Sequence, residues 1–335
     1  MVKTKIGVIG AGAWGTALAI HLAKLHNEIN IWGRNSDSLK SIIDSRQNQR
    51  YLPNIELPNN IVASYELASL IQQSTHLVVA VPSTTMRSMM QEINQHASDN
   101  LQGVIWACKG LEQASGKFLH QVAKEELADT ISNAILSGPS FAQEVGQGLP
   151  TAVTIASNDL PFANQVAQLF HHTLFRAYVS DDMTGVEIGG AFKNILAIAA
   201  GIIDGLAFGA NARAALITRG IAEMMRFGKH QHANMETFTG LSGIGDIVLT
   251  CTENLSRNRR FGLGIGQGKS VNEIEAEINQ VIEGKYATEV VYNLAQTLNI
   301  DLPITTQVYE VLYNNKPARS AVEDLLSRSL KHETD

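Results

Sequence analysis

The sequence has few cysteines, no long apolar run and no excess of positive charge. Its two cysteines, Cys108 and Cys251, are too few for a disulfide framework, which fits a reducing, cytoplasmic compartment. No uninterrupted stretch of about 20 apolar residues occurs, so no membrane span is expected. The 26 basic and 32 acidic residues give a net charge of −6, which argues against a nucleic-acid partner. Any anionic ligand must therefore be held by a local basic cluster.

Sequence patterns for metal binding and for a nucleophile are also lacking. His171-His172 and His230-x-His232 do not place two ligands on one face of a helix, so no metal site is expected. No G-x-S-x-G turn, which would present a nucleophilic serine, occurs. Cys108 follows an apolar run and is better explained as a small buried side chain than as a nucleophile.

The order of strands and helices divides the 335 residues into two expected domains. With 44% apolar and 17% charged residues, a chain of this length can bury two cores. In residues 1–183, short apolar runs alternate with amphipathic stretches, which predicts an α/β domain with a Rossmann-type, doubly wound parallel sheet. The expected strands are 6–9, 29–32, 77–81, 104–107, 134–136, 152–156 and 175–179, and the expected helices are 15–25, 36–44, 84–94 and 118–127.

Residues 184–335 show no strand pattern and are expected to form a C-terminal all-helical domain that binds the substrate. The expected helices are 186–203, 211–227, 271–278, 286–298, 305–312 and 318–330. No linker rich in proline, glycine or serine marks the boundary, so its position near Met183 rests on the change of pattern alone.

Gly10, Gly12 and Gly15 have the spacing G-x-G-x-x-G between the first expected strand and the first expected helix. Gly10 permits a tight turn, Gly12 lets a pyrophosphate approach the backbone, and Gly15 lets helix and strand pack closely. The free N–H groups and the positive dipole end of the helix then face the phosphates. A glycine-rich turn without a ligand is the alternative, but the strand and helix on either side favour dinucleotide binding.

The second expected strand ends in Trp32-Gly33-Arg34, without the acidic residue that usually binds the ribose 2′-hydroxyl of NAD. The guanidinium of Arg34 suits a 2′-phosphate and can stack on an adenine ring. This pattern favours NADP(H), with NAD(H) still possible. The alternative is a solvated arginine that simply follows a strand.

Two lysines stand in apolar surroundings. Lys109 follows the strand at 104–107, at the sheet edge where doubly wound folds bind ligands, but a charge that merely ends a strand in water would look the same. Lys193 is the one basic residue in the apolar stretch 186–203, so it either snorkels to the surface or lies in a dry site. A lysine in a dry site has a lowered pKa and can act as acid or base in carbonyl reduction.

A basic cluster and an aspartate complete the candidate residues. Arg257, Arg259 and Arg260 lie within four positions and can grip a phosphate through forked hydrogen bonds, or they can belong to a solvated loop. Asp246 can orient a catalytic lysine or cap the helix that follows it. Ser140 can cap a helix or face a ligand at the sheet edge.

Together these motifs resemble those of bacterial-type NAD(P)-dependent glycerol-3-phosphate dehydrogenases. The resemblance runs nearly end to end through GAGAWGTALA at 10–19, ACKG at 107–110, LSGPSFA at 136–142, FKN at 192–194, GLSGIGDIVLTC at 240–251, LSRNRRFG at 255–262 and VIEG at 281–284. Several motifs in a fixed order make it specific. It implies a cytoplasmic homodimer that acts on a small phosphorylated substrate and supplies glycerol phosphate for phospholipid synthesis.

The resemblance also implies roles for individual residues, with Lys193 as proton donor and acceptor beside Lys109 and Asp246. The substrate-binding set is then Lys109, Gly138, Ser140, Lys193, Asn194, Asp246, Ser256, Arg257 and Asn258. The cofactor-binding set is Gly10, Gly12, Ala13, Trp14, Gly15, Arg34, Tyr51, Lys109, Ala142, Arg257, Val281 and Glu283. Ala13 departs from the pattern, because many relatives carry a hydroxyl-bearing residue there that could bind the pyrophosphate.

Two other functions compete with this interpretation. A related helical-domain dehydrogenase could act on a 3-hydroxy acid or a sugar acid, but such substrates require a carboxylate site rather than a phosphate grip. A dinucleotide-sensing protein without turnover is the other alternative. A buried Lys193 beside Lys109 would be unnecessary in such a protein.

Overall fold

The computed structural model describes residues 4–329 and 332, which divide into two compact units. The first unit comprises the chain up to Cys108 together with Phe118–Met183, and the second comprises Lys109–Lys117 and the chain from Thr184 onward. The short segment Lys109–Lys117 therefore belongs to the second unit, although it lies within residues 1–183.

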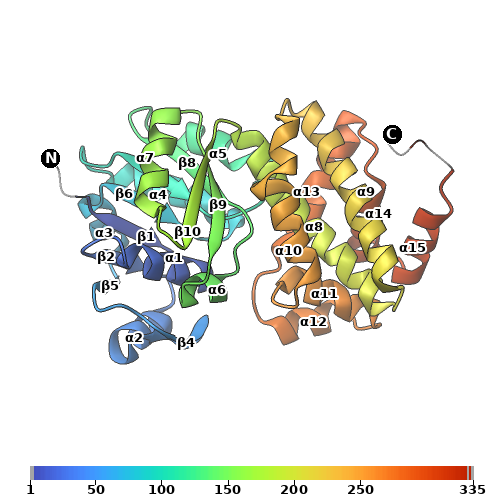
Figure 1. The fold of residues 1–335 in the computed structure, drawn as a ribbon, viewed down its shortest axis with the longest axis horizontal. Helices are drawn as coiled ribbons and strands as arrows, with labels where there is room; N and C mark the ends of the chain where they lie inside the picture. The colour runs from blue at the N-terminus through green and yellow to red at the C-terminus, as the bar shows by residue number, and fades with distance from the viewer. Residues whose placement is uncertain (1–3, 330–331, 333–335) are drawn as a thin grey trace. The chain divides into compact units, whose positions relative to one another are not determined.

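An eight-stranded sheet forms the centre of the first unit (Figure 1). Its strand order is β10-β9-β8-β7-β6-β1-β2-β5, and all neighbouring strands are parallel except β8 and β9. The strands are β1 (Ile6–Ile9), β2 (Ile29–Trp32), β5 (Ile61–Ser64), β6 (His76–Val79), β7 (Gly103–Trp106), β8 (Ser132–Ser137), β9 (Thr151–Ala156) and β10 (Phe175–Ser180). The expected Rossmann-type sheet followed by an all-helical part is confirmed.

The sheet differs from the expected one in two respects. The connection from β8 to β9 contains only the short helix α6 (Ala142–Gln147), and β9 returns antiparallel to β8, so the sheet is not wholly parallel. The sequence also gave no sign of β5 or of the two-stranded antiparallel sheet β3 (Gln47–Asn48) and β4 (Leu52–Glu56). These strands are short and partly exposed, so they lack the continuous apolar run that identifies a buried strand.

Helices cover both faces of the sheet (Figure 1). They are α1 (Ala13–Ala23), α2 (Ser36–Ser45), α3 (Leu67–Gln73), the 3-10 turn η1 (Ser83–Thr85), α4 (Met86–His96), α5 (Leu119–Glu126), α6 and α7 (Leu160–Phe170). Polar side chains fix two of the starts: Asn35 accepts from Ser38 N at 2.8 Å, and Asp159 accepts from Phe162 N at 3.2 Å. Strands β1, β6 and β7 are buried throughout because both faces are covered.

The second unit is helical. Its helices are α8 (Met183–Gly205), α9 (Gly209–His230), η2 (Met235–Thr239), the π turn η3 (Leu241–Gly245), α10 (Asp246–Thr252), α11 (Arg257–Gly266), α12 (Val271–Ile278), α13 (Glu283–Leu298), α14 (Pro303–Tyr313) and α15 (Ala318–Leu326). The expected end of the last helix, Leu330, lies outside the described residues. Helix α11 was not expected, and the arginine cluster therefore lies on a helix rather than in a loop.

Helix α8 is the most apolar element of the second unit. By length and composition it could cross a membrane, but 94% of its most apolar window is buried inside the protein. A core helix of a water-soluble domain has this character. Because the helix is mostly buried, a polar side chain on α8 needs a partner within the protein or in a bound ligand.

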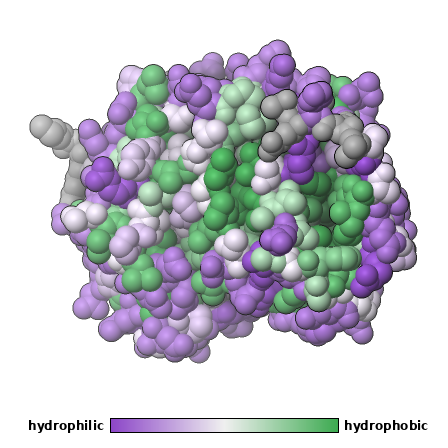
Figure 2. Space-filling model, turned by 45° about the vertical axis from the view of Figure 1, so that its right-hand side comes forward, coloured by the Kyte–Doolittle hydropathy of each residue, from purple (hydrophilic) through white to green (hydrophobic). Residues whose placement is uncertain are grey.

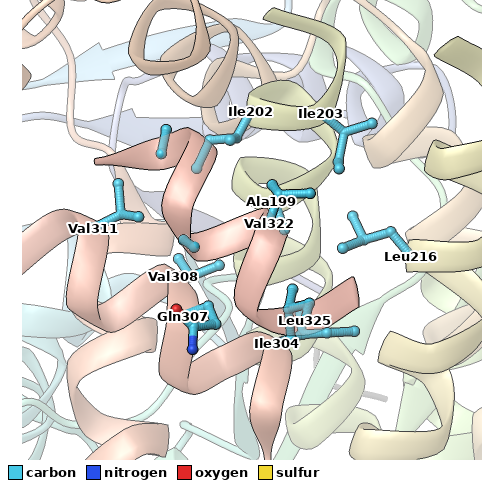
Figure 3. A pocket seen from close by; sticks show the side chains of 12 residues that line it. Ala199, Ile202, Ile203, Leu216, Ile304, Gln307, Val308, Val311, Val322 and Leu325 are labelled. Atoms are coloured by element: carbon cyan, nitrogen blue, oxygen red, sulfur yellow. The ribbon is translucent and has the colours of Figure 1, made fainter. Parts of the chain in front are cut away.

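Hydrophobic residues also reach the surface of the helical unit (Figure 2). A shallow groove lies between α8, α9, α14 and α15 (Figure 3). It is lined by Ala199, Ile202, Ile203, Leu216, Ile304, Gln307, Val308, Val311, Ala318, Ala321, Val322 and Leu325. All of these except Gln307 are aliphatic, so the groove offers no group for proton transfer.

Candidate active site

The glycine-rich turn between β1 and α1 has the geometry of an anion-binding site. Gly10 has φ +114°, and a Cβ there would lie 2.4 Å from the carbonyl oxygen of Ala80. A Cβ on Gly15 would lie 1.9 Å from the carbonyl oxygen of Gly10. Gly12, in contrast, faces open space, and α1 begins there without a side-chain cap or an acidic first turn. The first N–H groups of α1 are therefore available to a pyrophosphate, so these residues fit a dinucleotide.

A buried side chain that sequence reasoning missed holds this turn in place. Asn48 Nδ2 donates to the carbonyl oxygen of Ala11 at 2.9 Å and to Thr16 Oγ1 at 2.7 Å. Its Oδ1 accepts from the backbone N–H of Tyr51 at 3.4 Å. The backbone of Tyr51 is thereby fixed relative to the glycine turn. Sequence gave no signal for Asn48, because a single asparagine in a short strand is unremarkable.

The other expected cofactor residues of the first unit lie at helix starts or strand ends. Ala13 and Trp14 open α1 and are half-buried, and the indole N–H of Trp14 is buried without a hydrogen-bond partner. Ala142 opens α6, which packs against α1. Arg34 follows β2 and is exposed, so its guanidinium is free to meet a charged ligand.

Gly138 and Ser140 follow β8 directly. Gly138 has φ +128°, and Ser140 Oγ donates to its carbonyl oxygen at 3.1 Å. The expectation that Ser140 caps the next helix is wrong: α6 begins after Phe141, with no side-chain cap. The Ser140 hydroxyl instead closes its own turn, because that carbonyl lies nearer than the N–H groups of α6.

Three charged side chains from distant parts of the sequence meet in the second unit. Lys193 Nζ on α8 donates to Asp246 Oδ1 at 2.8 Å, and Lys109 Nζ donates to Asp246 Oδ2. The side chains of Lys109, Lys193 and Asp246 are 9%, 12% and 1% exposed. Thr250, one helical turn after Asp246, donates from Oγ1 to Asp246 Oδ1 at 3.2 Å. Both lysines thus share one carboxylate away from bulk water.

The electrostatics of this cluster favour a mobile proton. Burial lowers the pKa of Lys109 to about 8, with attraction by Asp246 opposing this shift and repulsion by Lys193 adding to it. Burial alone would raise the pKa of Asp246, but the two ammonium charges outweigh burial and lower it. Because two cations face one anion, the protonation of Lys109 depends on the charges of both of its neighbours.

Asn194, which follows Lys193 directly on α8, is joined to Asn258 on α11. Asn258 Nδ2 donates to Asn194 Oδ1 at 2.8 Å, and Asn258 Oδ1 accepts from Gly284 N at 3.0 Å. Gly201 and Gly262 let the two helices approach to backbone contact, which makes this possible. Asn194 Nδ2 is buried without a partner. An unsatisfied buried donor next to Lys193 is what a polar substrate group would satisfy.

The arginine cluster does not act as one phosphate grip. Arg259 is buried, pairs with Asp204, and donates from Nε to the carbonyl oxygen of Cys251 at 3.0 Å. The expectation that three arginines share one task is therefore wrong, because Arg259 stabilises the helical unit. Arg257 is half-buried, with one guanidinium nitrogen 3.3 Å from Gln280 Oε1, and Arg260 is exposed.

The remaining expected residues lie near the starts of helices. Ser256 caps α11, accepting from Arg259 N at 3.2 Å. Val281 is exposed, and Glu283 opens α13 directly before Gly284. Sequence reasoning also missed Thr250, although its spacing of four from Asp246 within a helix could have indicated the contact. Among residues 4–329 and 332, no group of three or more His, Cys, Asp or Glu side chains is arranged to hold a metal ion.

Comparison with known proteins identifies the family of the chain. Residues 5–163 match the family model for the N-terminus of NAD-dependent glycerol-3-phosphate dehydrogenase, and residues 182–323 match the model for its C-terminus. The chain belongs to this family. The resemblance drawn from the motifs is therefore confirmed.

Individual relatives match nearly the whole chain. The glycerol-3-phosphate dehydrogenase [NAD(P)+] of Thioalkalivibrio sulfidiphilus is 47% identical over 99% of this chain and 100% of its own length. A crystal structure of glycerol-3-phosphate dehydrogenase from Coxiella burnetii is 43% identical, with a TM-score of 0.93 over 97% of this chain and 99% of that one. The enzyme from Saccharomyces cerevisiae is 27% identical, with a TM-score of 0.82 over 97% and 100%.

Proposed function

We propose that this chain is an NAD(P)-dependent oxidoreductase that interconverts sn-glycerol 3-phosphate and dihydroxyacetone phosphate. The observation that carries the proposal is the buried cluster of Lys109, Lys193 and Asp246, which places two ammonium groups on one carboxylate away from bulk water. The near full-length relatives with this named activity support the substrate.

The first unit binds the dinucleotide. Gly12 leaves room for the pyrophosphate, and the first N–H groups of α1 donate to it. Ala13, Trp14, Tyr51 and Ala142 line the same site in this proposal. Once bound, the cofactor supplies or accepts the hydride at C2 of the substrate.

The second unit moves the proton. Lys193 Nζ protonates the carbonyl oxygen of dihydroxyacetone phosphate as C2 gains its hydride, and removes the hydroxyl proton in the reverse direction. Asp246 holds the Lys193 ammonium at 2.8 Å and stabilises it in its charged form. Lys109 adds a second positive charge, which favours release of the proton and stabilises a developing alkoxide.

The substrate phosphate is held away from the reacting carbon. Arg257 and Asn258 are assigned to it, with Asn194 Nδ2 donating to a substrate oxygen. Binding energy from this non-reacting group orients the carbonyl. Gly138, Ser140 and Ser256 are assigned to the remaining substrate contacts, and Val281 and Glu283 to the cofactor.

Cofactor preference is proposed to rest on Arg34. The names of the relatives allow both NAD and NADP, and Arg34 is exposed after β2 where an acidic residue would favour NAD. We assign NADP(H) as the preferred cofactor. From the family resemblance we further propose a cytoplasmic homodimer that supplies glycerol phosphate for phospholipid synthesis; the mass of the purified protein in solution tests the dimer.

A spectrophotometric assay tests the activity. Purified protein mixed with NADPH and dihydroxyacetone phosphate should consume NADPH, whereas unphosphorylated dihydroxyacetone should react far more slowly. Arg257→Ala should raise KM for dihydroxyacetone phosphate about 10- to 100-fold, because a charge contact to the phosphate is lost. The same variant should change the unphosphorylated reaction little. Turnover of a 3-hydroxy acid in place of glycerol phosphate, or NADPH binding without turnover, would contradict the proposal.

A further inference from the structure

Helix α8 carries two consecutive glycines, Gly189 and Gly190, one turn before Lys193. Both are buried in the interior of the helix. Glycine in a helix interior is destabilising relative to alanine. A pair of them in the central helix of the unit therefore indicates that some neighbour needs the space a Cβ would fill.

Gly190 borders the side chain of Lys109. A Cβ on Gly190 would lie 3.3, 3.4 and 3.7 Å from Cβ, Cγ and Cδ of Lys109. The aliphatic stem of the lysine thus lies flat against the helix at this point. Its Nζ then reaches Asp246, on the oxygen opposite to the one that binds Lys193.

Gly189 leaves space for the segment that carries Asp246. A Cβ on Gly189 would lie 2.1 Å from the carbonyl oxygen of Ser242 and 2.9 Å from its carbonyl carbon. Ser242 belongs to the π turn η3, which leads directly into Asp246 at the start of α10. The segment that carries Asp246 therefore contacts the backbone of α8 four residues before Lys193.

We propose that Gly190 is a positioning residue for the reaction, which sets the place of Lys109 relative to Lys193 across Asp246, while Gly189 sets the approach of the turn that carries Asp246. The proposal rests on the proposed dehydrogenase function. It extends the active site to two residues without functional side chains. Neither residue touches the reacting atoms.

A methyl group at position 190 would displace Lys109 without breaking the helix. At 3.3 Å from Lys109 Cβ the new contact is tight, so the lysine stem must move by a few tenths of an ångström. Catalytic geometry is sensitive on this scale, since a misplacement of about 1 Å can cost about 100-fold in rate. Because the displaced Lys109 loses attraction from Asp246, the pKa of Lys109 should fall.

The groups that take part in this shift are few. Asp246 and Cys251 face the cluster from α10, and Lys193 faces it from α8. Burial raises the pKa of the Cys251 thiol to about 12, so it stays neutral throughout the relevant range. The shift therefore reports the spacing of the two lysines and Asp246.

The test compares Gly190→Ala with the wild type. Its kcat should fall about tenfold, whereas the NADPH Kd should stay the same. Its melting temperature should hold or rise, since alanine favours the helix. A folded variant with wild-type kcat would overturn the proposal, as would a loss of NADPH binding together with a large drop in melting temperature.

A double-mutant comparison separates positioning from a general effect on the helix. In a Lys109→Met background, Gly190→Ala should lower kcat no further, because the group it positions is gone. A full tenfold loss in that background would contradict the role of Lys109.

A readout independent of turnover distinguishes failure of this inference from failure of the proposed function. Acetic anhydride labelling of Lys109, followed by mass spectrometry across pH, should show a midpoint near 8 in the wild type and a lower one in Gly190→Ala. Identical midpoints would overturn the positioning role even if the wild type proves to be an active dehydrogenase. If the wild type proved inactive but the two labelling midpoints differed, the proposed function would be refuted. The positioning of Lys109 by Gly190 would still stand.

Discussion

The two units differ in the ionisable side chains that they bury. Among the described residues, every Lys, Arg, Asp and Glu in the buried set belongs to the second unit, whereas the first buries histidines. Burial lowers the pKa of His21 to about 4, and His21 Nε2 lies 2.6 Å from the carbonyl oxygen of Phe170. Burial likewise lowers the pKa of His76 to about 4. These two rings are therefore neutral at physiological pH.

This difference matches the division of labour proposed for the enzyme. Binding a dinucleotide needs backbone N–H groups in a fixed turn, which glycine spacing supplies without any buried charge. Proton transfer needs ionisable side chains in a dry place, and the second unit keeps them by pairing Lys109 and Lys193 with Asp246. Changes to buried charge should therefore affect turnover in one unit and leave cofactor binding in the other intact.

Removing the charge of Lys193 should have the largest effect. In Lys193→Met we expect kcat to fall by about 10²- to 10⁴-fold, because the proton donor is gone while the apolar length of the side chain remains. The melting temperature should hold or rise, since Lys109 and Asp246 are left as a balanced pair. Steady-state kinetics and thermal unfolding on one preparation measure both. A wild-type kcat in Lys193→Met would show that Lys193 is not the proton donor, and Lys109 would become the next candidate for that role.

Removing the charge of Asp246 should instead destabilise the protein. Asp246→Asn leaves two buried ammonium groups without a counter-charge, which should cost about 3–5 kcal/mol in the free energy of unfolding. Urea unfolding of the variant at neutral pH measures this loss. If Lys193→Met proved the more destabilising of the two, the account of the cluster as two cations around one anion would be wrong.

A buried charge in the second unit can also stabilise the fold without a role in catalysis. Glu223 provides a test that distinguishes a structural role from a catalytic one. Its carboxylate accepts from Thr305 N at 3.1 Å, from Thr305 Oγ1 at 3.0 Å, and from Ile304 N, at the start of α14. Glu223→Ala leaves these donors unpaired and should destabilise the protein by about 1–3 kcal/mol. Its kcat at a temperature where it is folded should equal that of the wild type. A loss of kcat in the folded variant would assign Glu223 to the active site as well.

Glu223 should also make the stability of the protein depend on pH in a defined direction. Burial raises the pKa of Glu223 to about 7 from its ordinary 4.5, so the folded protein holds this proton more tightly than the unfolded chain. The wild type should therefore lose stability relative to Glu223→Gln as the pH rises from 4.5 to 7. Urea unfolding of both proteins across this range tests the direction.

The first unit should respond most weakly, at its exposed Arg34. Arg34→Ala should weaken NADPH binding about tenfold and NADH binding hardly at all, because only the former offers a 2′-phosphate. Fluorescence titration with both cofactors measures the ratio. Equal losses would remove the basis for assigning NADP(H) as the preferred cofactor.

The sequence predicted features that are local and missed those that depend on distant partners. The glycine spacing and the apolar stretch around Lys193 are legible within about 20 residues, and both stand in the structure where they were expected. The contact between Lys109 and Asp246 joins residues 137 positions apart, so only the fold reveals it. The space left by Gly190 is invisible for the same reason.

The predictions that proved wrong each overlooked an interaction partner or a strand direction that the local sequence does not show. Arg259 looked equivalent to Arg257, but Asp204 on α8 draws it into the core. Serine is a common helix cap, but the hydroxyl of Ser140 instead donates to the carbonyl oxygen of Gly138 in its own turn. The antiparallel β9 could not be distinguished from a parallel strand, because apolar content does not encode direction.

Titration of NADPH into Lys193→Met tests most directly the claim that Lys193 moves the proton and does not hold the cofactor. The account predicts a dissociation constant within about twofold of the wild-type value, in a protein whose kcat has fallen at least about 100-fold. A dissociation constant raised in proportion to the loss of kcat would contradict it, because Lys193 would then hold the cofactor rather than move the proton.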